Sequence, residues 1–192
     1  MTLSAFTLAV LALLLAPGPT NTLMAVAGAT HGLGRVLRLL PVELAAYLLT
    51  VVPLALLGAG LMSHAPRAAL ALKLVAALWV MVLAVRLWRS GASGADGFQI
   101  GAGRIFVTTL LNPKALIFGL VLLPAPVLSD FAARLSVFIA LVLAAALVWG
   151  GFGALSHDPG RAGGAQLGRA RRLASGWLAL VSVSLFWGVL RS

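Results

Sequence analysis

The residues of this chain that could do chemistry are few, and they interrupt long apolar runs. Pro17-Gly18-Pro19-Thr20-Asn21 breaks the first run, Asn112-Pro113-Lys114 breaks another, and Glu43 is the one acid within such a run. An interior proline removes a backbone hydrogen bond, and its ring clashes with the carbonyl four residues back. The two motifs therefore predict helices that are broken at a polar point.

Broken helices leave main-chain groups without their regular partners. The carbonyls that lose a donor are those of Leu13, Leu15 and Thr109. Nothing in hydrocarbon can satisfy them, so they must face protein or a wet cavity. Half-helix N-termini at such breaks attract carboxylates, which would suit an amino-acid zwitterion. A lone proline often only kinks a membrane helix, but two such motifs favour a functional interpretation. The candidate substrate-pathway residues are Pro17, Gly18, Pro19, Thr20, Asn21, Asn112, Pro113 and Lys114.

Lys114 is a charge expected deep in the membrane. It lies about ten residues into its segment, or about 15 Å from the surface at the rise of an α-helix. A lysine at that depth costs about 2.5–3.5 kcal/mol on insertion scales, so it normally faces the protein interior and finds a partner. We expect it to attract a substrate carboxylate or to hold the break of the fourth helix. The alternative is a side chain that snorkels to the surface.

Glu43 has three candidate roles. It could exchange a coupling proton, pair with Lys114, or receive a cationic substrate. The alternative is a solvated acid at the start of a helix, where it would favour the positive end of the helix dipole. We name Glu43 as the candidate for proton coupling.

The composition is that of a membrane protein. Of the 192 residues, 61% are apolar and 9% are charged, whereas a soluble domain carries about 25% charged residues. The net charge of +10 lies at the ends of apolar runs, where it indicates topology and contact with anionic membrane lipid, not nucleic acid. The chain has no cysteine, and we expect no cofactor and no metal site. No zinc-protease, serine-nucleophile or intramembrane-protease pattern is present, so we do not expect an enzyme.

Six apolar segments are long enough to cross a hydrocarbon core about 30 Å thick. They are Leu3–Gly28, Leu39–Met62, Ala68–Leu87, Ile105–Leu128, Leu135–Leu155 and Leu173–Leu190. We therefore predict a single all-α integral membrane transporter domain over residues 1–192, with six transmembrane helices.

The two breaks divide the chain into matching halves. Pro113 follows Pro17 by half the chain length, so each break falls in the first helix of a three-helix half, about 1–96 and 97–192. Because three spans reverse the direction of the chain, the halves would form an inverted repeat. Paired broken helices in such repeats mark a transporter's central site.

The arginines predict the orientation in the membrane. Nine of them lie in the first, third and fifth loops, against three on the other side. Because positively charged loops stay in the cytoplasm, we expect the loops around Asp96 and Asp158 inside and both termini outside.

These motifs resemble those of the lysine-exporter family (LysE/RhtB type) of amino-acid exporters. Pro17-Gly18-Pro19-Thr20-Asn21 resembles that family's signature in the first helix, and Asn112-Pro113-Lys114-Ala115 resembles its signature in the fourth. Residues 72–79 and 86–90 are similar to its third helix, and Arg171-Arg172-Leu173 is similar to the start of its last. The resemblance implies a protein of the bacterial inner membrane. It also implies export of amino acids or related small metabolites from the cytoplasm, driven by the gradient of protons or another coupling ion.

Two alternatives stand beside this interpretation. A cation or metal-ion transporter of similar architecture would need several inward carboxylates, and Glu43 alone is available. A non-transporting membrane subunit would instead bind a partner protein. The sequence leaves open which substrate is carried and whether the chain forms a homo-oligomer.

Overall fold

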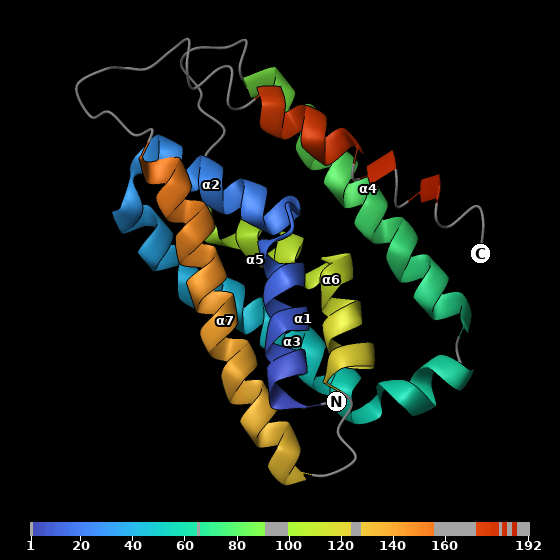
Figure 1. The fold of residues 1–192 in the computed structure, drawn as a ribbon. Coiled ribbons are helices and arrows are strands. Elements are labelled where there is room, and N and C mark those ends of the chain that lie inside the picture. Colours follow the sequence, from blue (N-terminus) through green and yellow to red (C-terminus); the bar gives the residue numbers. More distant parts are fainter. Residues whose placement is uncertain are drawn as a thin grey trace.

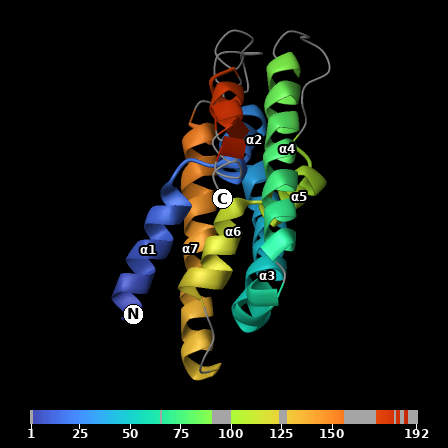
Figure 2. The ribbon, with the colours of Figure 1, turned by 90° about the vertical axis from the view of Figure 1, so that its right-hand side faces the viewer.

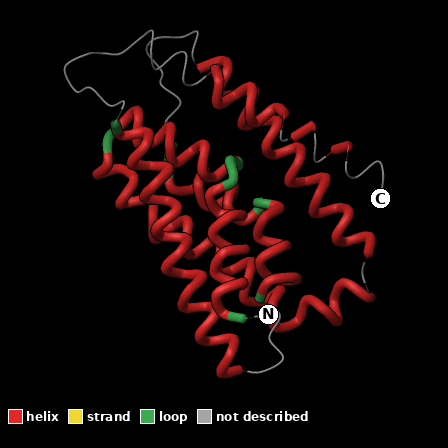
Figure 3. The backbone as a smooth tube through the Cα atoms, viewed as in Figure 1, coloured by secondary structure: helices red, strands yellow, loops and turns green. Residues whose placement is uncertain are grey.

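The computed structural model describes residues 2–64, 66–90, 100–123, 128–155, 172–180, 182–183 and 186–187, and within these ranges it contains helices and no strands (Figure 1; Figure 3). Residues 172–180 are helical. The other helices, in chain order, are α1 (Leu3–Leu15), α2 (Pro19–His31), α3 (Leu33–His64), α4 (Pro66–Ser90), α5 (Ala102–Leu110), α6 (Pro113–Ile117), the π-helix η1 (Phe118–Leu122) and α7 (Leu128–Ala154). The predicted all-α class is confirmed for this part of the chain.

The first apolar run is broken where the Pro-Gly-Pro motif lies. α1 ends at Leu15, α2 begins at Pro19, and the two helices are bent by 60°. Gly18 is the extended residue before α2, and Pro19 takes the first helical position, where its missing N–H costs nothing. Gly32 ends α2 with a φ of 72°, which glycine adopts without strain. The expected first span, Leu3–Gly28, is therefore a bent pair of helices.

The second predicted break is also present. α5 ends at Leu110 and α6 begins at Pro113, with a bend of 46° between α5 and the segment formed by α6 and η1. The side-chain oxygen of Asn112 accepts a hydrogen bond from the backbone N–H of Lys114 at 3.1 Å and so caps α6. The expected fourth span, Ile105–Leu128, is therefore a second bent pair.

Two unbroken helical stretches are long and apolar enough to cross a membrane, Leu33–Leu56 in α3 and Asp130–Ala154 in α7. If each bent pair is one span, the described residues contain up to four, by length and composition. This is consistent with a membrane protein. The expected span Ala68–Leu87 falls in α4, whose apolar stretch within the described residues is Ala77–Arg86.

The start of α3 differs from the expectation. The helix begins at Leu33 and not at Leu39, because Gly32 turns the chain directly from α2 into α3. As a result Glu43 lies well inside a continuous helix, and the interpretation of Glu43 as an acid at a helix start is wrong.

The start of α7 differs as well. The helix begins at Leu128 and not at Leu135, so Arg134 belongs to a helix and not to a loop. Its guanidinium lies over the ring of Phe6 in α1, 5.9 Å from the ring centroid. The face of an aromatic ring attracts a cation at this distance, which accounts for an arginine inside the helix.

The two bent pairs run in opposite directions through the molecule. α1 and α6 lie in the lower half of Figure 1, and α2 and α5 lie above them; Figure 2 shows the same order from the side. The first pair therefore rises from α1 to α2, whereas the second descends from α5 to α6. Inverted halves would produce this opposite course.

Two apolar clusters fill the protein above and below the breaks. The upper cluster draws mainly on α2, α3, α4 and α5 and includes Leu23 and Leu83. The lower cluster draws on α1, α3, α6, η1 and α7 around the rings of Tyr47, Phe118 and Phe138, which meet edge to face. Along each bent pair, the polar residues lie between members of the two clusters.

α2 and α7 touch backbone to backbone. A Cβ atom added to Gly28 would collide with the carbonyl oxygen of Gly150, and one added to Gly153 would collide with the carbonyl oxygen of Ala25. Gly151 of the same helix faces open space. Glycine at positions 28 and 153 therefore lets α2 and α7 approach closely.

α4 and residues 172–180 lie side by side at one edge of the molecule (Figure 1; Figure 2). Ser175 Oγ donates to the carbonyl oxygen of Ala84 at 2.6 Å, and Ser182 Oγ donates to that of Ala77 at 2.8 Å. Two buried serines thus attach the last described segments to α4.

Candidate functional site

Asn21 binds the end of α1. Its side-chain nitrogen donates to the carbonyl oxygens of Leu14 at 2.6 Å and Ala16 at 3.0 Å, across the Pro-Gly-Pro break. The last carbonyls of a helix have no amide donor further along the chain. Asn21 is buried near the start of α2, so α2 supplies from inside the protein the donor that α1 lacks.

Lys114 reaches the same end of α1 from the other half of the chain. Its Nζ donates to the carbonyl oxygen of Ala16, which also accepts from Asn21. An ammonium is favourable there because the last carbonyls of a helix carry negative partial charge. Gly18 leaves room for this contact, because a Cβ atom there would lie 3.0 Å from Nζ and 3.1 Å from Cε of Lys114. Lys114 therefore joins the two breaks and does not act on its own helix alone.

Asn112 joins the breaks a second time. While its oxygen caps α6, its side-chain nitrogen donates to Thr20 Oγ1 at 3.2 Å and to the Tyr47 oxygen at 3.3 Å. Thr109 Oγ1 donates to Thr20 Oγ1 at 3.3 Å. Thr20 and Thr109 are 0% exposed and Asn112 is 3% exposed, so these bonds form away from solvent. We call the following five residues the break network: Thr20, Tyr47, Thr109, Asn112 and Lys114.

Glu43 lies one helical turn before Tyr47 and is 2% exposed. Within the described residues, its Oε2 has no hydrogen-bond partner. Lys114 and Glu43 are close enough to interact electrostatically, but the ammonium is bonded to Ala16. The two charges therefore act on each other without a direct hydrogen bond, and Glu43 keeps an open acceptor beside the break network.

Further polar contacts surround the second break. Trp79 Nε1 donates to Thr108 Oγ1 at 3.1 Å and so links α4 to α5. Thr50 Oγ1 lies 3.5 Å from the carbonyl oxygen of Leu110, at the end of α5. The Thr50 hydroxyl also donates to the carbonyl oxygen of Ala46 in its own helix, at 3.1 Å, so Thr50 lies beside the end of α5 with its one proton shared between the two carbonyls.

Sequence reasoning missed several of these residues. The sequence patterns described above do not single out the side chains of Tyr47, Thr109, Thr50 and Thr108. A signal was present for most of them. Tyr47 is the only tyrosine of the chain and follows Glu43 by one helical turn, while the two adjacent threonines directly precede the second break.

The remaining candidates contribute less directly. Pro17 is exposed and Pro113 is half-buried, so their effect is on the backbone of the breaks. Asp96 and Asp158, which mark two of the loops expected in the cytoplasm, lie outside the described residues.

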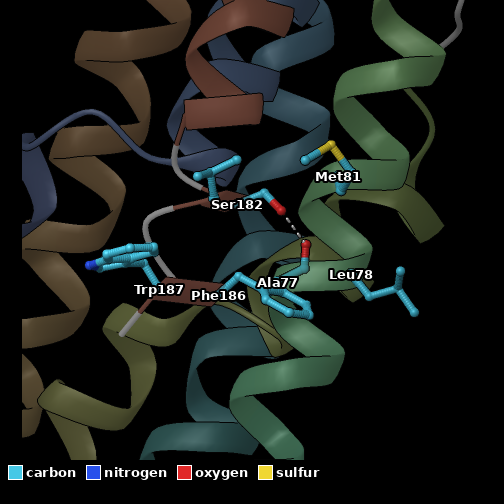
Figure 4. A pocket seen from close by; sticks show the side chains of 7 residues that line it. Ala77, Leu78, Met81, Ser182, Phe186 and Trp187 are labelled. Carbon is cyan, nitrogen blue, oxygen red and sulfur yellow. Dashed lines mark hydrogen bonds between the residues drawn. The ribbon is translucent and has the colours of Figure 1, made fainter. Parts of the chain in front are cut away.

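A separate pocket of about 300 Å³ lies at the edge of the molecule (Figure 4). Among its lining side chains only Ser182 is a hydroxyl, and it is bonded to the carbonyl oxygen of Ala77. The lining offers no charge to a zwitterion, so the break network is the better candidate site. The lining residues are Ala77, Leu78, Met81, Ser182, Val183, Phe186 and Trp187.

The groups around the breaks can bind both charges of a small zwitterion. Lys114 provides an ammonium for a carboxylate, and Glu43 provides an acceptor for an ammonium. Hydroxyl and amide groups of the break network lie beside them in otherwise apolar surroundings. No protein-family model, no curated protein and no solved structure matches the chain. The function is therefore argued from the chemistry of this site.

Proposed function

We propose that the protein is a secondary transporter that exports amino acids or related small metabolites from the cytoplasm, driven by the proton gradient. The observation that carries the proposal is the meeting of two broken, oppositely directed apolar helices at a buried polar network. Discontinuous helices in corresponding positions form the substrate and ion sites of many secondary transporters. The motifs at both breaks resemble those of LysE/RhtB-type exporters, and we propose membership of that family.

We further propose six transmembrane helices in two inverted halves, about 1–96 and 97–192, in the bacterial inner membrane. The two bent pairs, α3 and α7 supply four of them, and α4 and the helix over 172–180 contribute the other two. The end of α4 and the start of α3 lie at the upper end of Figure 1, with the start of α7 at the opposite end. These helix ends carry the arginines: the upper end has Arg35, Arg38, Arg86 and Arg89, and the opposite end has Arg134. The positive-inside rule then favours a cytoplasmic upper end and both termini outside.

The side chains have distinct roles in this proposal. Lys114 attracts the carboxylate of the substrate, and in doing so it leaves the carbonyl of Ala16 with Asn21 as its donor. Glu43 carries the coupling proton, because it is a buried carboxyl with an open acceptor position. Substrate binding and proton binding thus act on the same junction between the two broken helices.

Transport by the purified protein in lipid vesicles tests the proposal. Metabolite profiles of cells with and without the protein identify the compounds to load, and an imposed pH gradient supplies the driving force. We expect at least one zwitterionic compound to be transported. Lys114→Met is expected to lower the transport rate at least about tenfold, because the substrate carboxylate loses one charge-assisted hydrogen bond. Arg38→Ala, which removes an exposed charge, serves as the matched control.

The same experiment tests the non-transporting alternative. Transport without a second protein excludes a non-transporting subunit. Identical metabolite profiles, together with no movement of any amino acid in vesicles, would reject export.

A further inference from the structure

An open groove lies between the end of α4 and the helix over residues 172–180, at the edge of the molecule (Figure 1; Figure 2). Its volume is about 440 Å³, and it shares no lining residue with the break network or with the pocket in Figure 4. We call it the Arg172 groove, after the one charged side chain among its lining residues. These residues are Trp88, Arg172, Leu173, Gly176, Trp177 and Leu180.

The Arg172 groove is charged at one end and apolar along the rest. Arg172 lies beside the end of α4, whereas Leu180 lies eight residues further along its own helix, or about 12 Å away at the rise of an α-helix. Leu173 and Leu180 are 76% and 65% exposed, and both lie three or four residues from Gly176 or Trp177, so they share one face of the helix. A charged end beside an exposed apolar face matches the headgroup and acyl chain of a phospholipid.

The guanidinium of Arg172 is positioned at the groove and keeps its donors available. It lies over the ring of Trp88, 5.9 Å from the ring centroid. This contact depends on the charge and the face of the ring, and needs none of the N–H groups as a hydrogen-bond donor. Within the described residues, those N–H groups have no hydrogen-bond partner. A guanidinium with free donors matches the oxygens of a phosphate group.

The charges around the groove have one sign. Arg86 and Arg89 are exposed near the end of α4, and Arg171 precedes Arg172 in the sequence. The acids that the structure describes belong to other helices, α3 and α7. This end of the groove therefore attracts an anion, and the apolar lining favours an anion that carries a hydrocarbon chain.

Gly176 keeps the middle of the groove open. It is exposed, and a Cβ atom built on it would meet no atom within 4 Å. Close packing of helices therefore does not require glycine here, in contrast to Gly28 and Gly153. Because glycine has no side chain, an acyl chain can lie directly against the helix backbone at this position.

We propose that the Arg172 groove binds one anionic phospholipid, with its phosphate on the guanidinium of Arg172 and an acyl chain along the face from Leu173 to Leu180. Basic pockets between membrane helices bind the headgroups of anionic lipids, and tryptophans are enriched at the level of the headgroups. The proposal requires a membrane protein but not transport, so it does not depend on the proposed function.

Melting temperatures of the purified protein test the selectivity for an anionic lipid. The protein in a neutral detergent is mixed with phosphatidylglycerol or with phosphatidylcholine at equal mole fraction. We expect phosphatidylglycerol to give a melting temperature about 3–6 °C higher, the shift for a ligand at about ten times its Kd in a chain of this size. Arg172→Gln should lose most of this difference. Arg38→Gln, which removes an exposed arginine at the same end of the molecule, should keep it.

A second pair of variants tests the path of the acyl chain. Gly176→Leu places a side chain in the groove and should remove the difference between the two lipids. Gly151→Leu, at a glycine of α7 that also faces open space, should retain it.

Tryptophan fluorescence gives a readout in the wild type, which does not depend on the folding of any variant. Bromine on an acyl chain quenches a tryptophan that the chain contacts, and Trp88 and Trp177 line the groove. In vesicles with equal amounts of the two lipids, quenching should be stronger when phosphatidylglycerol carries the bromine than when phosphatidylcholine does. Trp88→Phe/Trp177→Phe should remove this preference.

Three results would overturn the proposal. The first is equal melting temperatures and equal quenching with the two lipids. The second is an equal loss in Arg172→Gln and Arg38→Gln, which would show a diffuse attraction to the net positive charge. The third is a shift with glycerol phosphate as large as that with the lipid, which would assign the groove to a free phosphate. A selective response to phosphatidylglycerol in a protein that exports nothing would support the lipid site and reject the proposed function.

Discussion

Asn112 donates a hydrogen bond to Thr20 Oγ1 at 3.2 Å, although the two residues belong to opposite halves of the chain. The same side chain caps α6 through its oxygen, at 3.1 Å from the N–H of Lys114. One amide therefore fixes the second break locally and attaches it to the first. The geometry of each broken helix depends on the other.

The contact between Asn112 and Thr20 should appear as an energetic coupling. Asn112→Ala removes the cap, at about 1 kcal/mol, and leaves buried groups unpaired, at about 1–3 kcal/mol. Thr20→Val removes the hydroxyl with little change of shape. We expect the double variant to lose less stability than the sum of the single losses, by about 0.5–1.5 kcal/mol, in denaturant unfolding of the purified protein. Strict additivity would contradict a direct contact.

Straightening the first helix should separate stability from function. Replacing Pro17 and Pro19 with alanine restores two N–H donors, so membrane abundance and stability should be retained or improved. Export should fall about tenfold or more, because the 60° bend brings Asn21 and Lys114 to Ala16.

Pro53, an exposed proline inside the unbroken α3, provides the control for the proline exchange. Pro53→Ala should leave export unchanged. Normal export by the Pro17→Ala/Pro19→Ala variant would show that the motif only kinks the helix.

Adding one methyl group between α2 and α7 should destabilise the protein. In Gly153→Ala the new Cβ meets the carbonyl oxygen of Ala25, which cannot move without moving α2, so we expect a loss of at least about 2 kcal/mol. Gly151→Ala, two residues earlier and facing open space, should stabilise by up to about 1 kcal/mol. Melting temperatures of the two variants make the comparison, and equal values would mean that the helices do not approach as described.

Removing the hydroxyl of Tyr47 should reduce export more than it reduces the stability of the protein. Its ring meets Phe118 and Phe138 edge to face, with centroid distances of 5.9 Å and 6.0 Å, and these contacts survive in Tyr47→Phe. The loss of the acceptor for Asn112 should cost about 1 kcal/mol, whereas Tyr47→Ala should cost about 3–5 kcal/mol. Unfolding experiments measure both. Unchanged export by Tyr47→Phe would place the hydroxyl outside the transport site.

Cysteine labelling can test the predicted orientation, because the chain has no cysteine of its own. With an impermeant reagent on intact cells, a cysteine at position 192 should label and one at position 96 should not. After permeabilisation both should label. Strong labelling at position 96 alone in intact cells would reverse the topology.

The breaks could be predicted from sequence because the effect of proline is local. A missing N–H and a steric clash act within one turn, so Pro17, Pro19 and Pro113 lie where helices end. Proline alone does not fix these positions, because α3 continues through Pro41 and Pro53. The helix caps follow from the same short range, as the oxygen of Asn112 shows.

The contacts between the breaks could not be predicted in this way. They depend on the rotation of each helix about its axis and on how closely the halves approach, which local sequence does not determine. Lys114 reaches Ala16 past Gly18, and Glu43 is buried within the helix α3, which begins directly after Gly32. Both outcomes are set by packing between segments that are distant in sequence.

At Gly153 and Ala25 the backbones of α2 and α7 approach so closely that no side chain lies between them. α1 also packs on α7, but through side chains such as the ring of Phe6, and packed helices can slide past each other by small adjustments of side chains. If the angle between the two parts of the first helix changes, we therefore expect α1 to move while α2 and α7 stay together. The hydrogen bonds from Asn21 and Lys114 to the carbonyl oxygen of Ala16 must break before α1 can move.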